Sequence, residues 1–312
     1  MKRLKKKAID RPVFVIGMDR SGTSVISEIM SLHDELGWIS NYNHRFRPLP
    51  QLSFLNRITQ IPNFGWYLRG KKRQDKMVSS RLRKYLPYCD EGDYTLWTQL
   101  CGHDFTWDFL GGGIPSARTC QRVRNYIRTV LKYQGRTRLI VKLTGPPRIN
   151  FLSTIFPDAI FVHVMRDPRA VTASLMRVSY WREKGGWERP FWTGLPPEDI
   201  RLWERSDRAP CVLAAVQWAR VLEQTWQESG PLFPGQFIEI KYEDFVGSAI
   251  DTITALLDRC GLGYSRAVKR YIDRIGNVRN MNTKYRQTLT PAELSAVQQA
   301  VNKTAQRAGY LF

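Results

Sequence analysis

Residues 13–24 read Val13-Phe-Val-Ile-Gly17-Met-Asp-Arg20-Ser21-Gly22-Thr23-Ser24. The first four residues are apolar and predict a short buried strand, and the residues from Val25 onward have helical spacing. The turn between them holds two glycines with the spacing of the phosphate-binding loop G-x-x-x-x-G-K-[ST]. In such a strand–turn–helix unit, backbone N–H groups at the helix N-terminus bind an anion. The stretch therefore predicts an anion-binding loop in an α/β fold.

The loop lacks the lysine of that motif. Thr23 occupies the lysine position, Ser24 occupies the final hydroxyl position, and a cation stands earlier, at Arg20. The usual lysine reaches the terminal phosphates of a nucleoside triphosphate, and an acidic side chain at a strand end helps to hold Mg²⁺. Here the strand predicted at 160–165 is followed by Arg166 and Asp167, and that Asp leads directly into a proline. A P-loop kinase or NTPase is therefore disfavoured and stays an alternative.

Three further apolar runs, at residues 139–141, 160–165 and 237–240, predict more strands. Their near-continuous apolar character is typical of a parallel sheet that is covered on both faces. Helical spacing follows or precedes each run, in residues 25–36, 118–132, 170–180 and 248–260, and residues 290–293 read as the capped start of a C-terminal helix. We predict an α/β fold with a central, mainly parallel sheet flanked by helices. One domain over residues 11–312 would follow a basic tail at residues 1–10.

The composition points to a basic globular protein. The chain has 312 residues, 48 Lys+Arg against 28 Asp+Glu, a formal net charge of +20, and 43% hydrophobic residues. Such values exclude a disordered or collagen-like chain. The positive surplus predicts an anionic partner, which can be a nucleic acid, a membrane surface or a phosphate- or sulfate-bearing small molecule. Five cysteines without a C-x-x-C pair disfavour a zinc ribbon or a disulfide scaffold.

The sequence contains no pattern of membrane insertion. No run approaches the roughly 20 apolar residues that cross a bilayer. The basic start is not followed by the apolar segment of a secretory signal. We therefore expect a cytoplasmic protein, with peripheral contact to a membrane left open. No pattern indicates an oligomeric state.

A second candidate site lies around Arg166, which ends the strand predicted at 160–165. Ser174 comes eight residues later, inside the predicted helix 170–180. A strand-end arginine and a helix serine can converge on one phosphate, to which a guanidinium can bind in a bidentate manner. Taken alone, a structural arginine that binds neighbouring carbonyl groups explains the pair equally well.

Taken together, the loop and the Arg166–Ser174 pair resemble those of sulfotransferases that use 3′-phosphoadenosine 5′-phosphosulfate (PAPS) as donor. The resemblance spans residues 13 to 286 and implies a P-loop-like three-layer fold. The residues that it implies for the donor are Arg20, Ser21, Gly22, Thr23 and Ser24 at the 5′-phosphosulfate, Arg166 and Ser174 at the 3′-phosphate, Tyr242 near the adenosine, and Lys284 in a basic segment that closes over the 3′-phosphate.

The reaction that this resemblance implies is a metal-independent, in-line transfer of a sulfuryl group to an acceptor hydroxyl or amine. The other product is adenosine 3′,5′-bisphosphate. Charge builds up on the bridging oxygen of the departing phosphate, and Arg20 and Lys142 would stabilise it. Lys142 directly follows the strand predicted at 139–141. We expect both residues to be catalytic.

The general base is less clearly marked in the sequence. Some members of the family place a Glu where this chain reads Ser-Asn-Tyr-Asn-His at residues 40–44, and others place a His where this chain has Thr144. Our first choice is His44, because imidazole titrates near neutral pH. Alternatives are His103 with Asp104, and the acidic residues in 90–93.

Two irregular segments, residues 45–75 and 181–210, are rich in Gly, Pro and aromatic residues. Loops of this length are uncommon in a compact domain unless they bind a ligand. We expect them to contribute to an acceptor site for a small molecule or a carbohydrate, and the net charge raises the question of whether that acceptor is anionic. The basic segments 69–84 and 116–148 would suit a nucleic-acid-binding protein, but no known nucleic-acid module accompanies them. Nucleic acid is therefore the less favoured partner.

Overall fold

The computed structural model describes residues 9–61, 79, 85–89, 94–111, 113–276, 278 and 280–312. Its centre is a five-stranded sheet of order β2-β3-β1-β4-β5, in which every neighbouring pair is parallel. The strands are β1 (Val13–Gly17), β2 (Leu36–Gly37), β3 (Arg138–Thr144), β4 (Ile160–Met165) and β5 (Phe237–Lys241). The α/β fold with a parallel central sheet and its four predicted strands are thus confirmed. The two-residue strand β2 is an addition.

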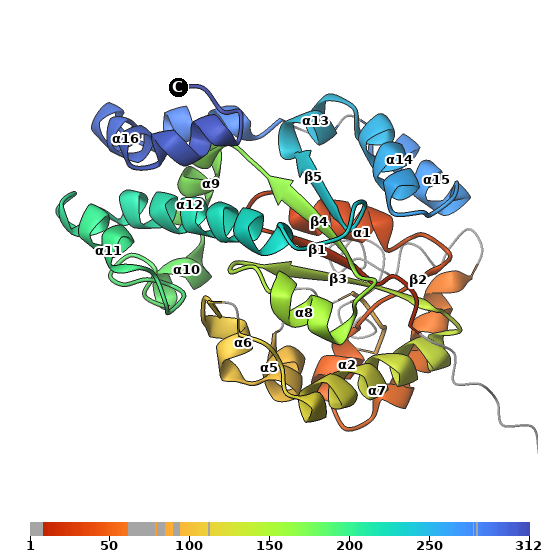
Figure 1. Ribbon diagram of the computed structural model, residues 1–312. Coiled ribbons are helices and arrows are strands. Elements are labelled where there is room, and N and C mark those ends of the chain that lie inside the picture. Colours follow the sequence, from red (N-terminus) through yellow and green to blue (C-terminus); the bar gives the residue numbers. More distant parts are fainter. Residues whose placement is uncertain are drawn as a thin grey trace, which may run out of the picture.

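Helices cover both faces of the sheet because the side chains of each buried strand alternate between two apolar cores. Val13 and Val15 of β1 pack with α1 (Thr23–Met30), α14 (Ala249–Arg259) and α15 (Arg266–Ile275). Phe14 and Ile16 point to the other face, toward α5 (Thr95–Cys101), α7 (Ala117–Gln134) and α8 (Ile149–Ile155). Figure 1 shows these two groups of helices on opposite sides of the strands. The result is the predicted three-layer, P-loop-like arrangement.

A third apolar cluster lies beside the sheet, around α9 (Pro168–Met176), α12 (Pro210–Ser229) and α16 (Pro291–Arg307). Trp218 of α12 is fully buried and donates a hydrogen bond from Nε1 to the carbonyl of Arg166 at 3.1 Å. The start of α16 is capped as the sequence predicts, since the Thr290 hydroxyl accepts from the Glu293 N–H and the Glu293 carboxylate accepts from the Thr290 N–H. The remaining elements are α2 (Asn41–Arg45), η1 (Pro50–Gln60), α6 (His103–Trp107), α10 (Ser179–Glu183), α11 (Pro197–Glu204), α13 (Tyr242–Gly247) and η3 (Asn282–Gln287).

Two predicted helices differ from the structure. The helix predicted over 25–36 ends at Met30, because tight turns follow: the N–H of Leu32 bonds to Ile29 and that of His33 bonds to Met30. Leu36 therefore belongs to β2. The helix predicted over 170–180 is also broken, since α9 ends at Met176 and α10 begins at Ser179. Arg177 and Val178 separate the two helices.

The structure does not test the predicted basic tail or the predicted single domain. Most of the basic tail at residues 1–10 lies outside the described residues. One domain over 11–312 stays a prediction, supported by the single sheet that joins the described elements.

Within the described part of the chain, none of the helices is long and apolar enough to cross a membrane. All five cysteines are free thiols.

Candidate active site

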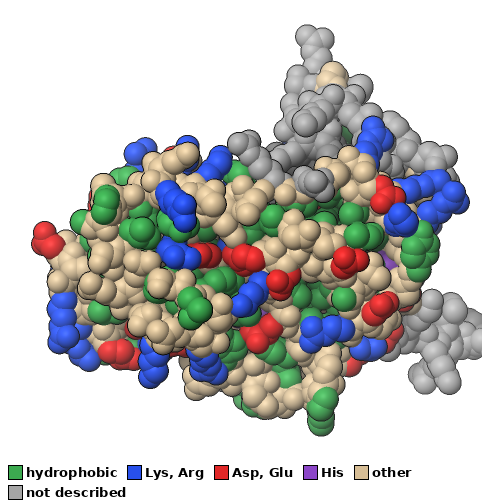
Figure 2. All heavy atoms as spheres, turned by 90° about the horizontal axis from the view of Figure 1, so that it is seen from above, with side chains coloured by type: hydrophobic (Ala, Val, Ile, Leu, Met, Phe, Trp, Pro, Cys, Tyr) green, Lys and Arg blue, Asp and Glu red, His purple; other side chains and the backbone are tan. Residues whose placement is uncertain are grey.

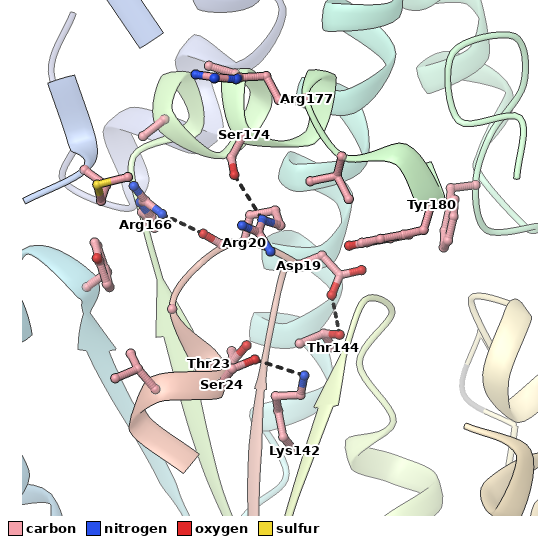
Figure 3. Close-up of a pocket in the computed structure, with 18 of the residues that line it drawn as sticks. Asp19, Arg20, Thr23, Ser24, Lys142, Thr144, Arg166, Ser174, Arg177 and Tyr180 are labelled. Atoms are coloured by element: carbon pink, nitrogen blue, oxygen red, sulfur yellow. Dashed lines mark hydrogen bonds between the residues drawn. The ribbon is translucent and has the colours of Figure 1, made fainter. Parts of the chain in front are cut away.

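A cavity of about 900 Å³ opens at the carboxyl ends of β1, β3 and β4. Ligands bind at this edge of parallel sheets, where successive connections leave in opposite directions. The chain runs from β3 to β4 across β1, so that β1 has later strands on both sides. The loop after β1 consequently lies in the middle of the cavity. Figure 3 shows this loop between Lys142 and Thr144 of β3 on one side and Arg166 and Ser174 on the other.

The loop has the backbone of an anion-binding turn. Gly17 and Gly22 have φ values of 142° and 92°, which glycine adopts without strain. Arg20, between them, is held at φ 71°, an uncommon value for a residue with a side chain. Gly22 is the N-cap of α1, where no side chain binds the exposed N–H groups and no acidic residue lies in the first turn. This helix N-terminus is therefore open to an anionic ligand.

Tyr242, the first residue of α13, covers the loop. A Cβ atom on Gly22 would lie 2.3 Å from Cδ2 of Tyr242, so only glycine permits this contact. The same ring lies beneath Arg166, whose Cζ is 4.3 Å from the ring centroid. Such a cation–π contact orients a guanidinium and leaves its N–H groups available. Tyr242 thus holds the loop and Arg166 together at one end of the cavity.

The two predicted phosphate motifs meet in the structure. Arg20 donates a hydrogen bond from Nε to Oγ of Ser174 at 3.0 Å. Arg166 donates from a terminal nitrogen to the carbonyl of Arg20 at 2.8 Å. Burial lowers the pKa of Arg166 below its usual value, and the nearby Tyr242 and Glu243 offset only part of this effect. The carbonyl contact that the structural interpretation of Arg166 expects is therefore present, and it is made inside the same cavity as the loop, so both interpretations stay open at this point.

A chain of hydrogen-bonded side chains, which the sequence did not indicate, holds Arg166 in place. Its Nε donates to Oδ1 of Asn282 at 2.7 Å, and Nδ2 of Asn282 donates to Oε1 of Glu243 at 2.6 Å. The Tyr310 hydroxyl donates to the other oxygen of Glu243 at 3.0 Å. Burial and the charge of Glu243 both raise the pKa of Tyr310, which therefore stays a donor. Residues near the C-terminus thus fix the direction of Arg166.

Positive charge dominates the cavity. Lys142 lies opposite Val15 in the β1–β3 register and donates a hydrogen bond from Nζ to Oγ of Ser24 at 3.2 Å. The basic side chains that line the cavity are Arg20, Lys142, Arg166, Arg177, Lys184 and Lys284. In a partly buried site, these charges and the α1 N-terminus favour a ligand with several negative charges.

Asp19 is the exception to this charge pattern. Its Oδ1 accepts a hydrogen bond from Oγ1 of Thr144 at 2.5 Å, and the Tyr180 hydroxyl points toward it in Figure 3. Burial raises the pKa of Tyr180, as do the charge of Asp19 and a hydrogen bond to it. The Tyr94 hydroxyl accepts from the N–H of Thr144 at 2.6 Å and fixes this strand end. The sequence contained no signal for this group beyond the place of Asp19 in the loop.

An aromatic wall closes the side of the cavity beyond Asp19. It consists of Trp107, Tyr180, Phe191 and Trp192, with Lys184 among them. The Lys184 ammonium lies 4.6 Å from the ring centroid of Trp107. Part of the segment 181–210 thus reaches the cavity as predicted. Its other tryptophans pack into the cluster around α12, where Trp181 and Trp203 are buried.

The sequence profile of the sulfotransferase family matches residues 12–266. The chain belongs to the sulfotransferase family. It is 22% identical over 283 residues to the omega-hydroxy-beta-dihydromenaquinone-9 sulfotransferase Stf3 of Mycobacterium bovis and of Mycobacterium tuberculosis. That alignment covers 81% of this chain, which spans 63% of the length of those relatives.

Solved sulfotransferase structures share the fold. The sulfotransferase STF9 from Mycobacterium avium superposes with a TM-score of 0.60 at 18% identity, covering 97% of this chain and 78% of the other. For STF1 from Mycobacterium tuberculosis the TM-score is 0.51 at 15% identity, with 95% and 77% covered. At these identities the likeness concerns the fold alone, which is the P-loop-like fold of sulfotransferases.

Most of the residues expected to bind the donor or to take part in catalysis line the cavity. They are Arg20, Gly22, Thr23, Ser24, Lys142, Arg166, Ser174, Tyr242 and Lys284. Ser21 does not line it, because its side chain is fully buried and its N–H bonds to the carbonyl of Met18. The structure therefore does not place Ser21 in contact with the cavity.

The structure does not bring His44 into the cavity. The single turn of α2 directs this side chain inward, where it is 4% exposed and not among the lining residues. His103 and Asp104 are exposed and do not line the cavity either. Residues 90–93 and most of the basic segment 69–84 lie outside the described residues, and the described residues of 45–75 do not line the cavity. The search for a proton acceptor therefore moves to other residues.

Charge on one face of the molecule is mixed. Figure 2 shows that on the face seen from above, Lys and Arg side chains alternate with Asp and Glu and do not form one continuous patch. Within the segment 116–148, Arg122 and Arg124 donate to the carbonyls of Leu100 and Ile155. These two cations therefore serve packing. The cations that line the cavity favour an anionic ligand there.

Proposed function

We propose that this chain is a sulfotransferase that moves a sulfuryl group from PAPS to a hydroxyl group of a small-molecule acceptor. The observation that carries the proposal is the meeting of two anion sites in one cavity, through the hydrogen bond between Arg20 and Ser174 and that between Arg166 and the Arg20 carbonyl. A donor with separate 5′ and 3′ anionic groups needs two such sites. Membership of the family supports the same activity.

The donor residues divide between its two ends. The backbone N–H groups at the start of α1, with Arg20, Thr23 and Ser24, would bind the 5′-phosphosulfate. Arg166 and Ser174 would bind the 3′-phosphate, and Lys284 would cover it from η3. Tyr242 also lines the cavity, and the family resemblance places this residue near the adenosine. The residues present fit PAPS, because cations and helix N–H groups surround the cavity.

The chemistry follows from where charge develops. As the acceptor oxygen forms its bond to sulfur, the bond from sulfur to the bridging phosphate oxygen breaks, and that oxygen takes the electron pair. Lys142, joined to Ser24 at 3.2 Å, stands beside the loop where this oxygen would lie. Arg20 and the loop N–H groups add to this electrostatic stabilisation, which in enzymes is often the largest contribution to rate. The products are the sulfated acceptor and adenosine 3′,5′-bisphosphate.

No metal is part of the proposed reaction. Among the described residues there is no group of three or more His, Cys, Asp or Glu side chains that could hold an ion. The independence from metal stays a prediction. Its check is turnover in the presence of a chelator, compared with turnover after Mg²⁺ is added.

We infer an acceptor that carries a flat or elongated apolar part next to its hydroxyl group. Trp107, Phe191 and Trp192 offer apolar surface to such a part. The related mycobacterial proteins are named for a hydroxylated menaquinone, which has both features. Lys184 and Arg177 would bind a negative group if the acceptor has one, as the net charge of the chain first suggested. A carbohydrate acceptor is tested in the same panel.

The decisive experiment incubates the purified chain with PAPS and a panel of hydroxylated quinones, sterols, phenols and sugars. Mass spectrometry would detect the sulfated product together with adenosine 3′,5′-bisphosphate. We expect calorimetric binding of the bisphosphate and no turnover of ATP with Mg²⁺. ATP hydrolysis without bisphosphate binding would support the kinase or NTPase alternative. Salt-sensitive binding to nucleic acid in a mobility-shift assay, again without bisphosphate binding, would support the alternative of a nucleic-acid-binding protein.

A further inference from the structure

Transfer to a hydroxyl group releases a proton, and an enzyme gains rate when a nearby side chain accepts it. Among the described residues that line the cavity, Asp19 is the only carboxylate, and none of them is a histidine. Tyr94 and Tyr180 are neutral phenols, and the pKa of Tyr180 is raised further. The lining thus offers one ordinary proton acceptor.

Asp19 is also in the right place. Gly17 is paired with Thr144 in the β1–β3 register, which brings the start of the loop to the end of β3. Lys142 lies two positions before Thr144 on the same strand, so the two side chains leave the same face. Asp19 bonds to Thr144 and therefore lies near the side of the cavity that Lys142 occupies, between the donor loop and the aromatic wall. A hydroxyl group that lies against that wall would meet Asp19 next to the donor.

The charge of Asp19 is difficult to explain by donor binding. A carboxylate inside an anion-binding loop repels the donor and weakens its binding. The neighbouring groups stabilise this charge, because the Thr144 hydroxyl and Tyr180 hydroxyl donate to it. A carboxylate has room for about four hydrogen bonds. Acceptor capacity thus remains for a hydroxyl group of the substrate.

We propose that Asp19 is the general base of this sulfotransferase and that Thr144 and Tyr180 are its positioning residues. The proposal rests on the proposed function. The proton of the acceptor hydroxyl moves to a carboxylate oxygen of Asp19 as the new O–S bond forms, and the electron pair of the breaking S–O bond leaves with the bisphosphate. Asp19 then returns the proton to solvent.

Several charged and titratable groups surround this carboxylate. Arg20 from the loop, Lys142 from β3, Tyr94 before α5 and Tyr180 from α10 share the cavity with Asp19, and Arg148 before α8 acts on it electrostatically. The other cations of the lining are Arg166, Arg177, Lys184 and Lys284. The high pKa of Tyr180 keeps its hydroxyl protonated and able to donate to Asp19.

The test compares Asp19→Asn with the wild-type chain in three measurements. We expect kcat to fall about 10²- to 10⁴-fold, the range for loss of a general base. Bisphosphate binding by calorimetry should be unchanged or tighter, because the substitution removes a repulsive charge and keeps the side-chain shape. The decline of kcat/KM toward acid pH should disappear in the variant. Asp258→Asn, on the exposed end of α14, is the charge-matched control and should leave all three measurements unchanged.

A further variant separates positioning from structure. Thr144→Val removes the hydroxyl donor and keeps the size of the side chain, so kcat should fall less than in Asp19→Asn while bisphosphate binding is kept. Asp19→Asn with turnover within about threefold of wild type would overturn the proposal, since a base contributes more. Loss of bisphosphate binding in Asp19→Asn would also overturn it, because Asp19 would then serve the loop. A wild-type chain that transfers no sulfuryl group would overturn both this proposal and the proposed function.

Discussion

Asn282 accepts a hydrogen bond from Nε of Arg166 at 2.7 Å, although 116 residues separate the two in the chain. Its amide nitrogen in turn donates to Glu243, so the asparagine fixes the guanidinium in one orientation. A guanidinium that is held in place loses less entropy when it binds a phosphate. The strength of the proposed 3′-phosphate site thus depends on a residue that need not touch the ligand.

The first prediction concerns this support. Asn282→Ala should raise the dissociation constant of adenosine 3′,5′-bisphosphate about 10-fold, because a hydrogen bond to a charged group contributes roughly 1.5–3 kcal/mol. Isothermal calorimetry measures the effect. The matched control is Asn302→Ala, on the exposed face of α16, where the lost bond is a surface contact to Gln306. Equal affinities for the two variants would contradict the role of Asn282.

The second prediction concerns the contact between Gly22 and Tyr242. Gly22→Ala should abolish bisphosphate binding or weaken it more than 10-fold, because the new Cβ displaces the Tyr242 ring and with it Arg166. Gly235→Ala is the control, since Gly235 has φ +84° and no atom within 4 Å of an added Cβ. Both variants carry the strain of a left-handed backbone, about 1 kcal/mol. Calorimetry should therefore separate them, and thermal melts should show the larger loss of stability for Gly22→Ala, whose added Cβ also clashes with the buried Tyr242 ring.

The sequence was sufficient to predict the centre of this fold and most of the residues that meet around the loop after β1. The signals there are local: an apolar strand followed by a glycine turn predicts β1 and its loop, and Arg166 stands at the end of an apolar run. Strand β2 was not predicted, because its two residues, Leu36 and Gly37, are too few to show a repeating pattern of apolar positions. Helix α12 was not identified, because apolar residues on most of its surface give it little of the one-sided pattern that marks a helix.

The acceptor side depends on contacts that no local pattern records. The role now proposed for Asp19 arises from its bond to Thr144, 125 residues later in the chain. The choice of His44 followed from its residue type, but one turn of helix directs the side chain into the interior. The tryptophans of 181–210 looked alike in sequence, and only packing separates Trp192, which lines the cavity, from Trp181 behind it.

The third prediction concerns the aromatic wall. Trp107→Ala should raise KM for an apolar acceptor about 10-fold or more, since it removes a large apolar surface from the cavity. Bisphosphate binding should stay as in the wild type, because the expected donor residues lie on the loop side. Phe233→Ala, at a side chain that is 76% exposed, is the control and should change neither quantity. A parallel loss of donor affinity in Trp107→Ala would mean that the wall belongs to the donor site.

The last prediction concerns stability and pH. Burial raises the pKa of Glu228 in α12, against opposing hydrogen bonds from Gln224 and from the N–H of Asn150. The folded chain therefore holds this proton at pH values where the unfolded chain, with a pKa near 4.5, has released it. Stability from this group is full below pH 4.5 and is lost as pH rises through the folded-state pKa.

Glu228→Gln removes this titration and keeps the shape of the side chain. The melting temperature of the variant relative to wild type should therefore increase as pH rises from 4.5 toward 8, as measured by calorimetric or fluorescence melts across that range. Glu188→Gln, at an exposed carboxylate, should show a difference that does not change with pH. A difference for Glu228→Gln that stays constant, or that decreases with rising pH, would show that the buried carboxylate is as well stabilised in the folded chain as it is in water.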